Sequence, residues 1–269
     1  MTHSESGKKI EIEIRGLSVT YRGREADVHA VKNCSFSVAR GDVVGLVGES
    51  GSGKSSALMA IPQLLPSGTL VDGQIICGGL DLAKLSENAM NEWRWRKIAL
   101  VPQGAMNSFT PHLTVERHIT EVLEHHLKTP KNEGKKRAVS LMEAVGLDAR
   151  ILSRYPHELS GGQKQRAALA LALACDPDFL LADEPTTALD VITQKEVLET
   201  IANLVRDRGM GLILVTHDLP LAAGACDTLI VMKDGAIVES GPSEDIIASP
   251  GNAYTRTLID AIKEMEVPS

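Results

Sequence analysis

The stretch GESGSGKSS, residues 48–56, constrains the fold of this chain more than any other feature. It matches the pattern G-x-x-x-x-G-K-[ST], in which glycines let the loop curl until successive backbone N–H groups face phosphate oxygens. The apolar run VVGLV comes just before the loop, and SALMAIPQLL, which can start a helix, begins at its last residue. A buried strand, a glycine loop and a helix in this order predict a phosphate-binding loop in an α/β protein.

The side chains of this loop indicate its ligand. Lys54 can reach the β- and γ-phosphates of a nucleotide, and the hydroxyl of Ser55 can bind Mg²⁺. We therefore expect ATP together with Mg²⁺, and the ring of Tyr21, before the second strand, could stack on adenine. The loop residues expected to contact the nucleotide are Gly48, Glu49, Ser50, Gly51, Ser52, Gly53, Lys54, Ser55 and Ser56.

Polar residues at the ends of other apolar runs add the chemistry of a nucleotide site. The run DFLLAD ends at Asp183, where a carboxylate at the C-terminal edge of a sheet can bind Mg²⁺. Glu184 follows directly, so its carboxylate can face the water that attacks a γ-phosphate. KIALVPQ ends at Gln103, an amide that could contact metal and water, and GLILVTH ends at His217, within reach of a γ-phosphate. Alone, each of these last two is more commonly structural, but the phosphate loop favours function.

Hydrophobic periodicity predicts a single nucleotide-binding unit. IEIEIR alternates like a half-buried strand, LIVMKDGAIVES predicts a hairpin that turns at Asp234-Gly235, and helical patterns dominate residues 106–174. The pattern therefore predicts an α/β core with a helical insertion. Further strands are expected at 29–40, 43–47, 97–103, 178–183 and 211–217, and further helices at 86–96, 114–127, 135–147 and 191–209.

Composition restricts the function classes. The chain of 269 residues has a net charge of −7, which gives no general attraction to nucleic acid. No segment approaches the ~18 apolar residues that span a bilayer, and the polar N-terminus lacks the apolar run of a signal peptide. The four cysteines are scattered singly, which disfavours a disulfide framework or an iron–sulfur site. The adjacent His125 and His126 are more commonly surface residues of a solvated helix than metal ligands.

A second candidate anion site lies much later in the chain. LSGGQKQR, residues 159–166, reads Ser-Gly-Gly and runs into an alanine- and leucine-rich helix. Free backbone N–H groups at the start of a helix attract anions. One small chain thus carries two phosphate-seeking loops, and the residues alone give no reason for the second.

In order and approximate spacing, these features resemble the ATP-binding cassette (ABC) transporter ATPase family over nearly the whole chain. LSGGQ is the most specific feature, because other phosphate-loop enzymes lack it. The resemblance implies an α/β, P-loop NTPase fold with an N-terminal antiparallel β subdomain, a mostly parallel core sheet and a helical subdomain. It implies one ABC ATPase domain over residues 1–269, with 8–103 and 166–245 as β subdomain and RecA-like core, 104–165 as helical subdomain and 246–269 as C-terminal helical tail. The matching pieces are Tyr21, GESGSGKS, Gln103, LSGGQ, FLLADEP, TALD at 187–190 and His217.

The resemblance also gives the second loop a role. In this family two cassettes pair head to tail, and each ATP lies between the phosphate loop of one chain and the LSGGQ of the other. The residues that would serve the partner's nucleotide are Ser160, Gly161, Gly162, Gln163 and Asp190. The implied Mg²⁺ ligands are Ser55, Gln103 and Asp183. The implied catalytic residues are Glu184 as general base, His217 as γ-phosphate sensor and Gln103.

Finer features are similar to the oligopeptide, dipeptide and nickel importer branch: VPQGAMNSFTPHLTV, YPHELSGGQKQR and SPGNAYTRTLIDAI. This branch implies a peripheral ATPase at the cytoplasmic face of the inner or plasma membrane that powers import of peptides, nickel or a related small solute. The implied partners are a second ABC ATPase, identical or paralogous, permease subunits docked on the region from Gln103 to Leu159, and indirectly an extracytoplasmic solute-binding protein. The chain ends at Ser269 without the cysteine cluster that many members carry, and Phe109-Thr110-Pro111 replaces their common N-P.

Two alternative functions stay open on the sequence. An ABC ATPase without a membrane partner could act in an assembly pathway, and neighbouring genes for permeases would distinguish the two. An ordinary phosphate-loop kinase would need a pocket for an acceptor substrate and would leave LSGGQ without a role.

Overall fold

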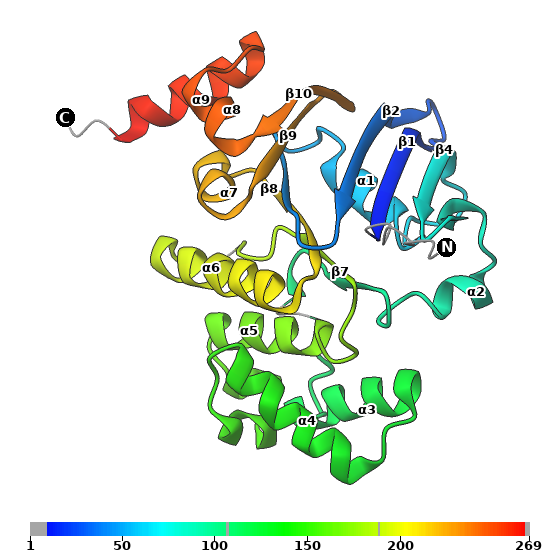
Figure 1. The fold of residues 1–269 in the computed structure, drawn as a ribbon, viewed down its shortest axis with the longest axis vertical. Coiled ribbons are helices and arrows are strands. Elements are labelled where there is room, and N and C mark those ends of the chain that lie inside the picture. Colours follow the sequence, from blue (N-terminus) through cyan, green and yellow to red (C-terminus); the bar gives the residue numbers. More distant parts are fainter. Residues whose placement is uncertain (1–9, 106–107, 188, 267–269) are drawn as a thin grey trace, which may run out of the picture.

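The computed structural model describes residues 10–105, 108–187 and 189–266, and it shows two β-sheets with helices around them (Figure 1). The larger, core sheet has six strands in the order β10-β9-β3-β8-β7-β6. Neighbours from β9 to β6 run parallel, and β10 runs antiparallel to β9. The strands are β3 (Val43–Val47), β6 (Ile98–Val101), β7 (Phe179–Asp183), β8 (Gly211–Thr216), β9 (Thr228–Lys233) and β10 (Ala236–Pro242).

The core sheet separates two hydrophobic cores. Its central strands β3, β7 and β8 are buried along their whole length and are apolar except for Asp183 and Thr216, the last residues of β7 and β8, as expected for parallel strands covered on both faces. Successive side chains of a strand point to opposite faces. In β3, Val43 and Val47 therefore join the core that the helical half of the chain completes, whereas Val44 and Leu46 join the core beneath the second sheet.

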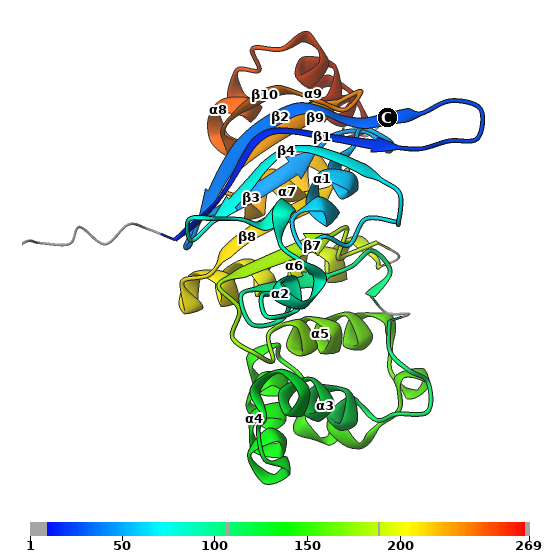
Figure 2. The same cartoon turned by 90° about the vertical axis from the view of Figure 1, so that its right-hand side faces the viewer.

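The second sheet is antiparallel, with the order β2-β1-β4-β5. Helix α1 (Lys54–Ala60) lies between the two sheets and contacts strands of both, which Figure 2 shows from the side. The sequence did not predict β4, because Asp72-Gly73 interrupts its apolar pattern. Gly73, with φ of +97°, lies where the pairing with β1 shifts register. The strands are β1 (Glu11–Tyr21), β2 (Val28–Ala39), β4 (Leu70–Cys77) and β5 (Leu80–Asp81).

One group of helices lies at one end of the molecule, and the C-terminal helices α8 and α9 lie at the other (Figure 1). Helix α5 contacts α3 and α4 on one side and α6 and β6 on the other, so it joins the helical group to the core sheet. The group consists of α3 (Val115–Leu127), α4 (Lys131–Ala144), the 3₁₀ turns η3 (Ala149–Ser153) and η4 (Pro156–Glu158), and α5 (Gly161–Ala172). The others are η1 (Leu82–Lys84), α2 (Glu87–Asn91), α6 (Val191–Arg208), α7 (Leu219–Ala225), α8 (Ser243–Ala248) and α9 (Ala253–Glu266).

One predicted helix is much shorter than expected. The pattern at 86–96 predicted a single helix, but α2 ends at Asn91 and the chain turns back at Trp95, where φ is +66°. The guanidinium of Arg94 explains the turn, because it donates hydrogen bonds to the carbonyls of Pro62 and Gln63 instead of facing solvent. A tertiary contact has overridden the local helical pattern.

The predicted fold class is confirmed: an N-terminal antiparallel sheet, a mostly parallel core sheet and a helical part occur together. The predicted hairpin also forms, with Asp234 and Gly235 at positive φ between β9 and β10. Within the described residues, no helix combines the length and apolar character needed to cross a membrane.

Candidate functional site

The order of strands brings together residues that lie far apart in the sequence. Strands β3, β8, β7 and β6 are parallel neighbours, so their C-terminal ends meet at one edge of the core sheet. The glycine loop follows β3, His217 follows β8, Asp183 ends β7, and Gln103 lies just beyond β6. A cavity of about 320 Å³ at this edge is lined by Tyr21, Val28, Ala30, Ser50, Gly51, Gly53, Lys54, Ser55, Ser56, Gln103 and Glu184.

Two glycines make the loop possible. Gly48 and Gly53 have φ of +146° and +98°, where L side chains are strained. A Cβ on Gly53 would lie 2.1 Å from the carbonyl oxygen of Ala30, and one on Gly48 would lie 2.2 Å from that of Met232. The loop therefore packs against neighbouring backbone so closely that only glycine fits at both positions.

The side chain of Lys54 is held inside the loop. Its Nζ donates to the carbonyl oxygens of Gly48 and Glu49, both at 2.8 Å, and is 3.3 Å from the hydroxyl of Ser52. Burial lowers the pKa of Lys54, although the carboxylates of Glu184, Asp183 and Glu49 oppose that shift. An ammonium has three N–H donors, and the one on the longest contact, to Ser52, is the one that can most easily donate to a phosphate oxygen instead.

Asp183 and Ser55 form a pair of oxygen donors beside the loop. The hydroxyl of Ser55 donates to Oδ1 of Asp183 at 2.8 Å, and Asp183 is only 2% exposed. Burial raises the pKa of Asp183, and the neighbouring charge of Glu184 raises it further. A nearby cation stabilises the charged form of a buried carboxylate of this kind. Mg²⁺ prefers hard oxygen ligands, so this pair and the amide oxygen of Gln103 fit the predicted metal.

Glu184 is the centre of a hydrogen-bond cluster. Its Oε2 accepts from Nε2 of Gln103 at 2.9 Å and from the hydroxyl of Thr187 at 3.0 Å, and its Oε1 lies 3.2 Å from Nδ1 of His217. Burial alone would raise the pKa of Glu184, but the hydrogen bonds from His217 and Thr187 outweigh it and hold the pKa below its usual value. The backbone of Glu184 has φ of +43°, a strained conformation that directs the carboxylate at this cluster.

Tyr21 lies at the edge of the same cavity. Its hydroxyl is 2.9 Å from that of Ser56, and its ring is half-buried at the end of β1. The structure thus brings every residue predicted to serve this chain's own nucleotide to one edge of the core sheet, either lining the cavity or bonded to a residue that does. Adenine stacking by Tyr21 stays a prediction.

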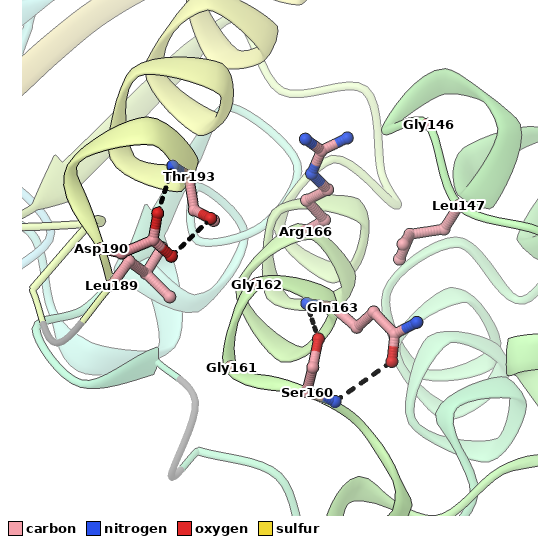
Figure 3. A pocket seen from close by; sticks show the side chains of 10 residues that line it. All are labelled: Gly146, Leu147, Ser160, Gly161, Gly162, Gln163, Arg166, Leu189, Asp190 and Thr193. Atoms are coloured by element: carbon pink, nitrogen blue, oxygen red, sulfur yellow. Dashed lines mark hydrogen bonds between the residues drawn. The ribbon is translucent and has the colours of Figure 1, made fainter.

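The residues predicted to act on a partner's nucleotide gather elsewhere, around a second cavity of about 480 Å³ (Figure 3). Ser160 caps α5: its hydroxyl accepts from N–H of Gln163 at 3.3 Å, and the side-chain oxygen of Gln163 accepts from N–H of Ser160 at 3.1 Å. The carboxylate of Asp190 caps α6: it accepts a hydrogen bond of 3.1 Å from the N–H of Thr193 and one of 2.7 Å from the hydroxyl of the same residue. The complete lining is Gly146, Leu147, Ser160, Gly161, Gly162, Gln163, Arg166, Leu189, Asp190 and Thr193.

The two cavities have no residue in common. The phosphate loop and the Ser-Gly-Gly helix start of one chain therefore belong to separate sites. Sequence reasoning gave no site role to Thr187, although it lies in the quoted TALD, nor to Arg166, which follows LSGGQ. Ala188, in the same TALD, and residues 106–107, after Gln103, lie outside the described residues.

Comparison with known proteins places the chain among ATP-binding transport subunits. The family model described as ABC transporter matches residues 31–187. The probable D,D-dipeptide transport ATP-binding protein DdpD of Escherichia coli (strain K12) is 38% identical over 96% of this chain and 80% of its own length. The oligopeptide transport ATP-binding protein OppD of Bacillus subtilis (strain 168) is 39% identical over 95% of this chain and 72% of its own length.

The fold has a solved counterpart. The ATP-binding cassette MJ0796, determined as a dimer in a post-hydrolysis state bound to ADP and Pi, is 30% identical, with a TM-score of 0.77 over 86% of this chain and 98% of the cassette. The architecture and site thus define a P-loop ATPase of the cassette type. The chain belongs to the ABC transporter family. Its relatives come from the peptide-transport branch that the sequence indicated.

Proposed function

We propose that the chain is the ATP-hydrolysing subunit of a membrane importer, and that closure of a cassette dimer around ATP drives transport. The observation that carries this proposal is the separation of the two cavities. The first is lined by the phosphate loop and Glu184, with Asp183 bonded to Ser55, and the second is lined by two capped helix starts and by no residue of the phosphate loop. Each cavity is half of a nucleotide site if a second cassette supplies the other half.

An exposed apolar pair supports a partner at this place. Val191 and Ile192, which follow Asp190 at the start of α6, are 75% and 74% exposed in the single chain. Large apolar side chains beside a polar cavity are typical of a surface that another protein covers. A helix start on the partner would also favour a triphosphate over a diphosphate, because its N–H groups attract the γ-phosphate that a diphosphate lacks.

The proposed chemistry assigns distinct work to the residues of the first cavity. Lys54 and the loop amides bind the phosphates, Ser55, Asp183 and Gln103 hold Mg²⁺, and bound Mg²⁺ would offset charge on the phosphate oxygens. Glu184 orients the attacking water and accepts its proton. In the nucleotide-free chain both oxygens of this carboxylate are already engaged. A carboxylate oxygen can accept two hydrogen bonds, so Oε1, which lies next to Nδ1 of His217, can still accept from the attacking water.

A groove beside the helical group supports docking of a permease. An apolar cavity of about 320 Å³ lies where α5 meets β6, and its lining includes Trp95, Leu100, Phe109 and Leu171. An amphipathic helix from a membrane subunit could place its apolar face there. The subunit would then lie at the cytoplasmic face of the inner or plasma membrane, with an extracytoplasmic solute-binding protein as an indirect partner.

The proposed solute is a peptide, nickel or a related small solute, and the relatives, which are named for dipeptide and oligopeptide transport, favour a peptide. These names also favour transport over an assembly role. The chain itself shows no site for a metal cargo: among the described residues, no group of three or more His, Cys, Asp or Glu could hold an ion.

The first test is removal of the loop lysine. We expect Lys54→Ala to lower ATP turnover by at least about 100-fold, because loss of one preorganised donor to a reacting group has this effect. Binding of ATP with Mg²⁺, measured by calorimetry, should weaken strongly as well. Lys84→Ala removes an exposed lysine and serves as the control. Near-normal turnover in Lys54→Ala would contradict the assigned role of the loop.

A further inference from the structure

The C-terminal helix contacts the phosphate loop through one side chain. The hydroxyl of Tyr254, in the first turn of α9, accepts a hydrogen bond of 3.2 Å from the backbone N–H of Glu49. Glu49 belongs to the loop, 205 residues away in sequence. No motif used in the sequence analysis gives Tyr254 a role, although it lies in the segment that resembled the importer branch.

The peptide group between Gly48 and Glu49 connects Tyr254 to Lys54. Its N–H faces Tyr254, and its C=O, from Gly48, accepts the 2.8 Å hydrogen bond from Nζ of Lys54. This peptide bond is trans, so its N–H and C=O point in opposite directions within one rigid plane. Rotation of this plane would break both bonds together. The orientation of the plane therefore determines where the ammonium of Lys54 is held.

Several contacts hold the ring of Tyr254 in place. Nζ of Lys233, at the end of β9, lies 4.6 Å from the ring centroid. The start of α9 is fixed to β10, because the carboxylate of Glu239 accepts from N–H of Gly251 at 2.6 Å and of Asn252 at 3.2 Å. Asn252 in turn accepts from N–H of Tyr254 at 2.8 Å. The hydroxyl is thus presented to the loop by ordered structure.

The hairpin that leads to α9 also contacts the loop. N–H of Gly235, at the turn between β9 and β10, donates to the carbonyl of Ser52 at 3.1 Å. Two backbone groups of the loop, at Glu49 and Ser52, are therefore held from outside by the segment 233–254. Neither contact comes from the strand or helix that flanks the loop.

We propose that Tyr254 is a positioning residue for nucleotide binding, which orients the Gly48–Glu49 peptide so that its carbonyl holds Lys54 ready for the phosphates. This inference rests on the proposed ATPase function and adds the C-terminal helix to it. Preorganisation lowers the cost of binding, because the loop need not be ordered when the nucleotide arrives. Once a nucleotide is bound, its phosphates hold Lys54 directly, so the effect of Tyr254 falls on affinity and not on the chemical step.

The test is Tyr254→Phe, which keeps the ring under Lys233 and removes only the hydroxyl. We expect the Kd for ATP and for ADP, each with Mg²⁺ and measured by calorimetry, to rise about three- to tenfold, as for loss of one hydrogen bond. The value of kcat should change less than about twofold, because Glu184 and its partners are untouched. Amide hydrogen exchange across residues 48–54 of the nucleotide-free protein should become faster.

Thr257→Val is the matched control, because it removes from the same helix a hydroxyl whose only hydrogen bond within the described residues is to the carbonyl of Ala253. It should leave Kd, kcat and exchange unchanged. Lys233→Met is the second variant, which removes the cation over the ring but keeps the hydroxyl, and it should raise Kd by a smaller factor. Unchanged nucleotide affinity in Tyr254→Phe, or a loss of kcat at unchanged Kd, would overturn the inference. Failure of the unmodified chain to bind ATP would instead contradict the proposed function itself.

Discussion

Asp183 and Glu184 are neighbours in sequence, yet their surroundings shift their pKa values in opposite directions. Burial raises the pKa of Asp183, which has a hydroxyl and a lysine to offset the cost of its charge. Glu184 is also desolvated, but donors from His217 and Thr187 bring its pKa below the ordinary value. Two carboxylates of different character at one sheet edge suit two tasks, a metal ligand and a group that acts on water.

This difference predicts an unusual effect of Asp183→Asn on stability. The raised pKa means that the folded protein is stabilised when Asp183 is protonated, and that this stability is lost as pH rises through the folded pKa. Asparagine removes the buried charge, so Asp183→Asn should raise the Tm of the nucleotide-free protein by a few degrees at neutral pH. This gain in Tm should disappear below about pH 4, where the wild-type Asp183 carboxyl becomes protonated in both the folded and the unfolded protein.

Thermal unfolding from acid to neutral pH, without nucleotide and Mg²⁺, measures this effect. Glu184→Gln is the matched control, because the lowered pKa of Glu184 contributes stability above its unfolded pKa that is lost as pH falls. It should lower the Tm at neutral pH. A lower Tm for Asp183→Asn at neutral pH would show that its charge is compensated better than its burial suggests.

At the scale of elements, helix caps carry both stability and the second cavity. Asp190 caps α6, an 18-residue helix, and its carboxylate accepts from the N–H of Thr193 at the helix start. We expect Asp190→Ala to lower the free energy of unfolding by about 1 kcal/mol, the usual cost of a lost N-cap. Denaturant unfolding measures the change. Asp207→Ala, in the last turn of the same helix, should be close to neutral, because an anion there opposes the helix dipole. Equal losses in both variants would contradict the capping role.

The sequence predicted those elements whose pattern is local. The central strands, α6 and the hairpin at Asp234-Gly235 were expected because periodicity and turn chemistry define them without distant contacts. Strand β4 was missed because Gly73 interrupts the apolar pattern of the strand, at the point where its pairing with β1 shifts register. The end of α2 was missed because the bonds of Arg94 to the carbonyls of Pro62 and Gln63 are visible only in the fold. The contact of Tyr254 with Glu49 was missed for the same reason.

At the scale of the whole molecule, the proposed function makes each of two cavities half of a nucleotide site that a second chain completes. The cavity at the phosphate loop and the cavity at Ser160 are lined by different residues. The cassette MJ0796, which has the same fold, was solved as a dimer. A head-to-tail pair would bring the first cavity of one chain against the second cavity of the other, so ATP would act as part of the interface.

A hydrolysis-deficient variant tests this arrangement. Glu184→Gln should reduce turnover by about 100-fold or more, because it removes the group that orients water and accepts its proton. The phosphate contacts remain, so ATP should persist and hold the pair closed. Sedimentation should show a dimer with ATP and Mg²⁺ and a monomer without them. If the natural partner is a paralogue, the same measurement belongs in the reconstituted pair.

The double variant Glu184→Gln with Ser160→Arg then separates the trans site from other causes of association. An arginine at the start of α5 replaces a cap whose hydroxyl lies at the second cavity, and its bulk blocks the approach of the opposing ATP. The dimer should be lost, although each chain still binds ATP through Lys54. Ser153→Arg places the same side chain on an exposed serine of η3 and should leave the dimer intact. A dimer that forms without ATP, or that survives Ser160→Arg, would mean that this helix start does not contact the partner's nucleotide.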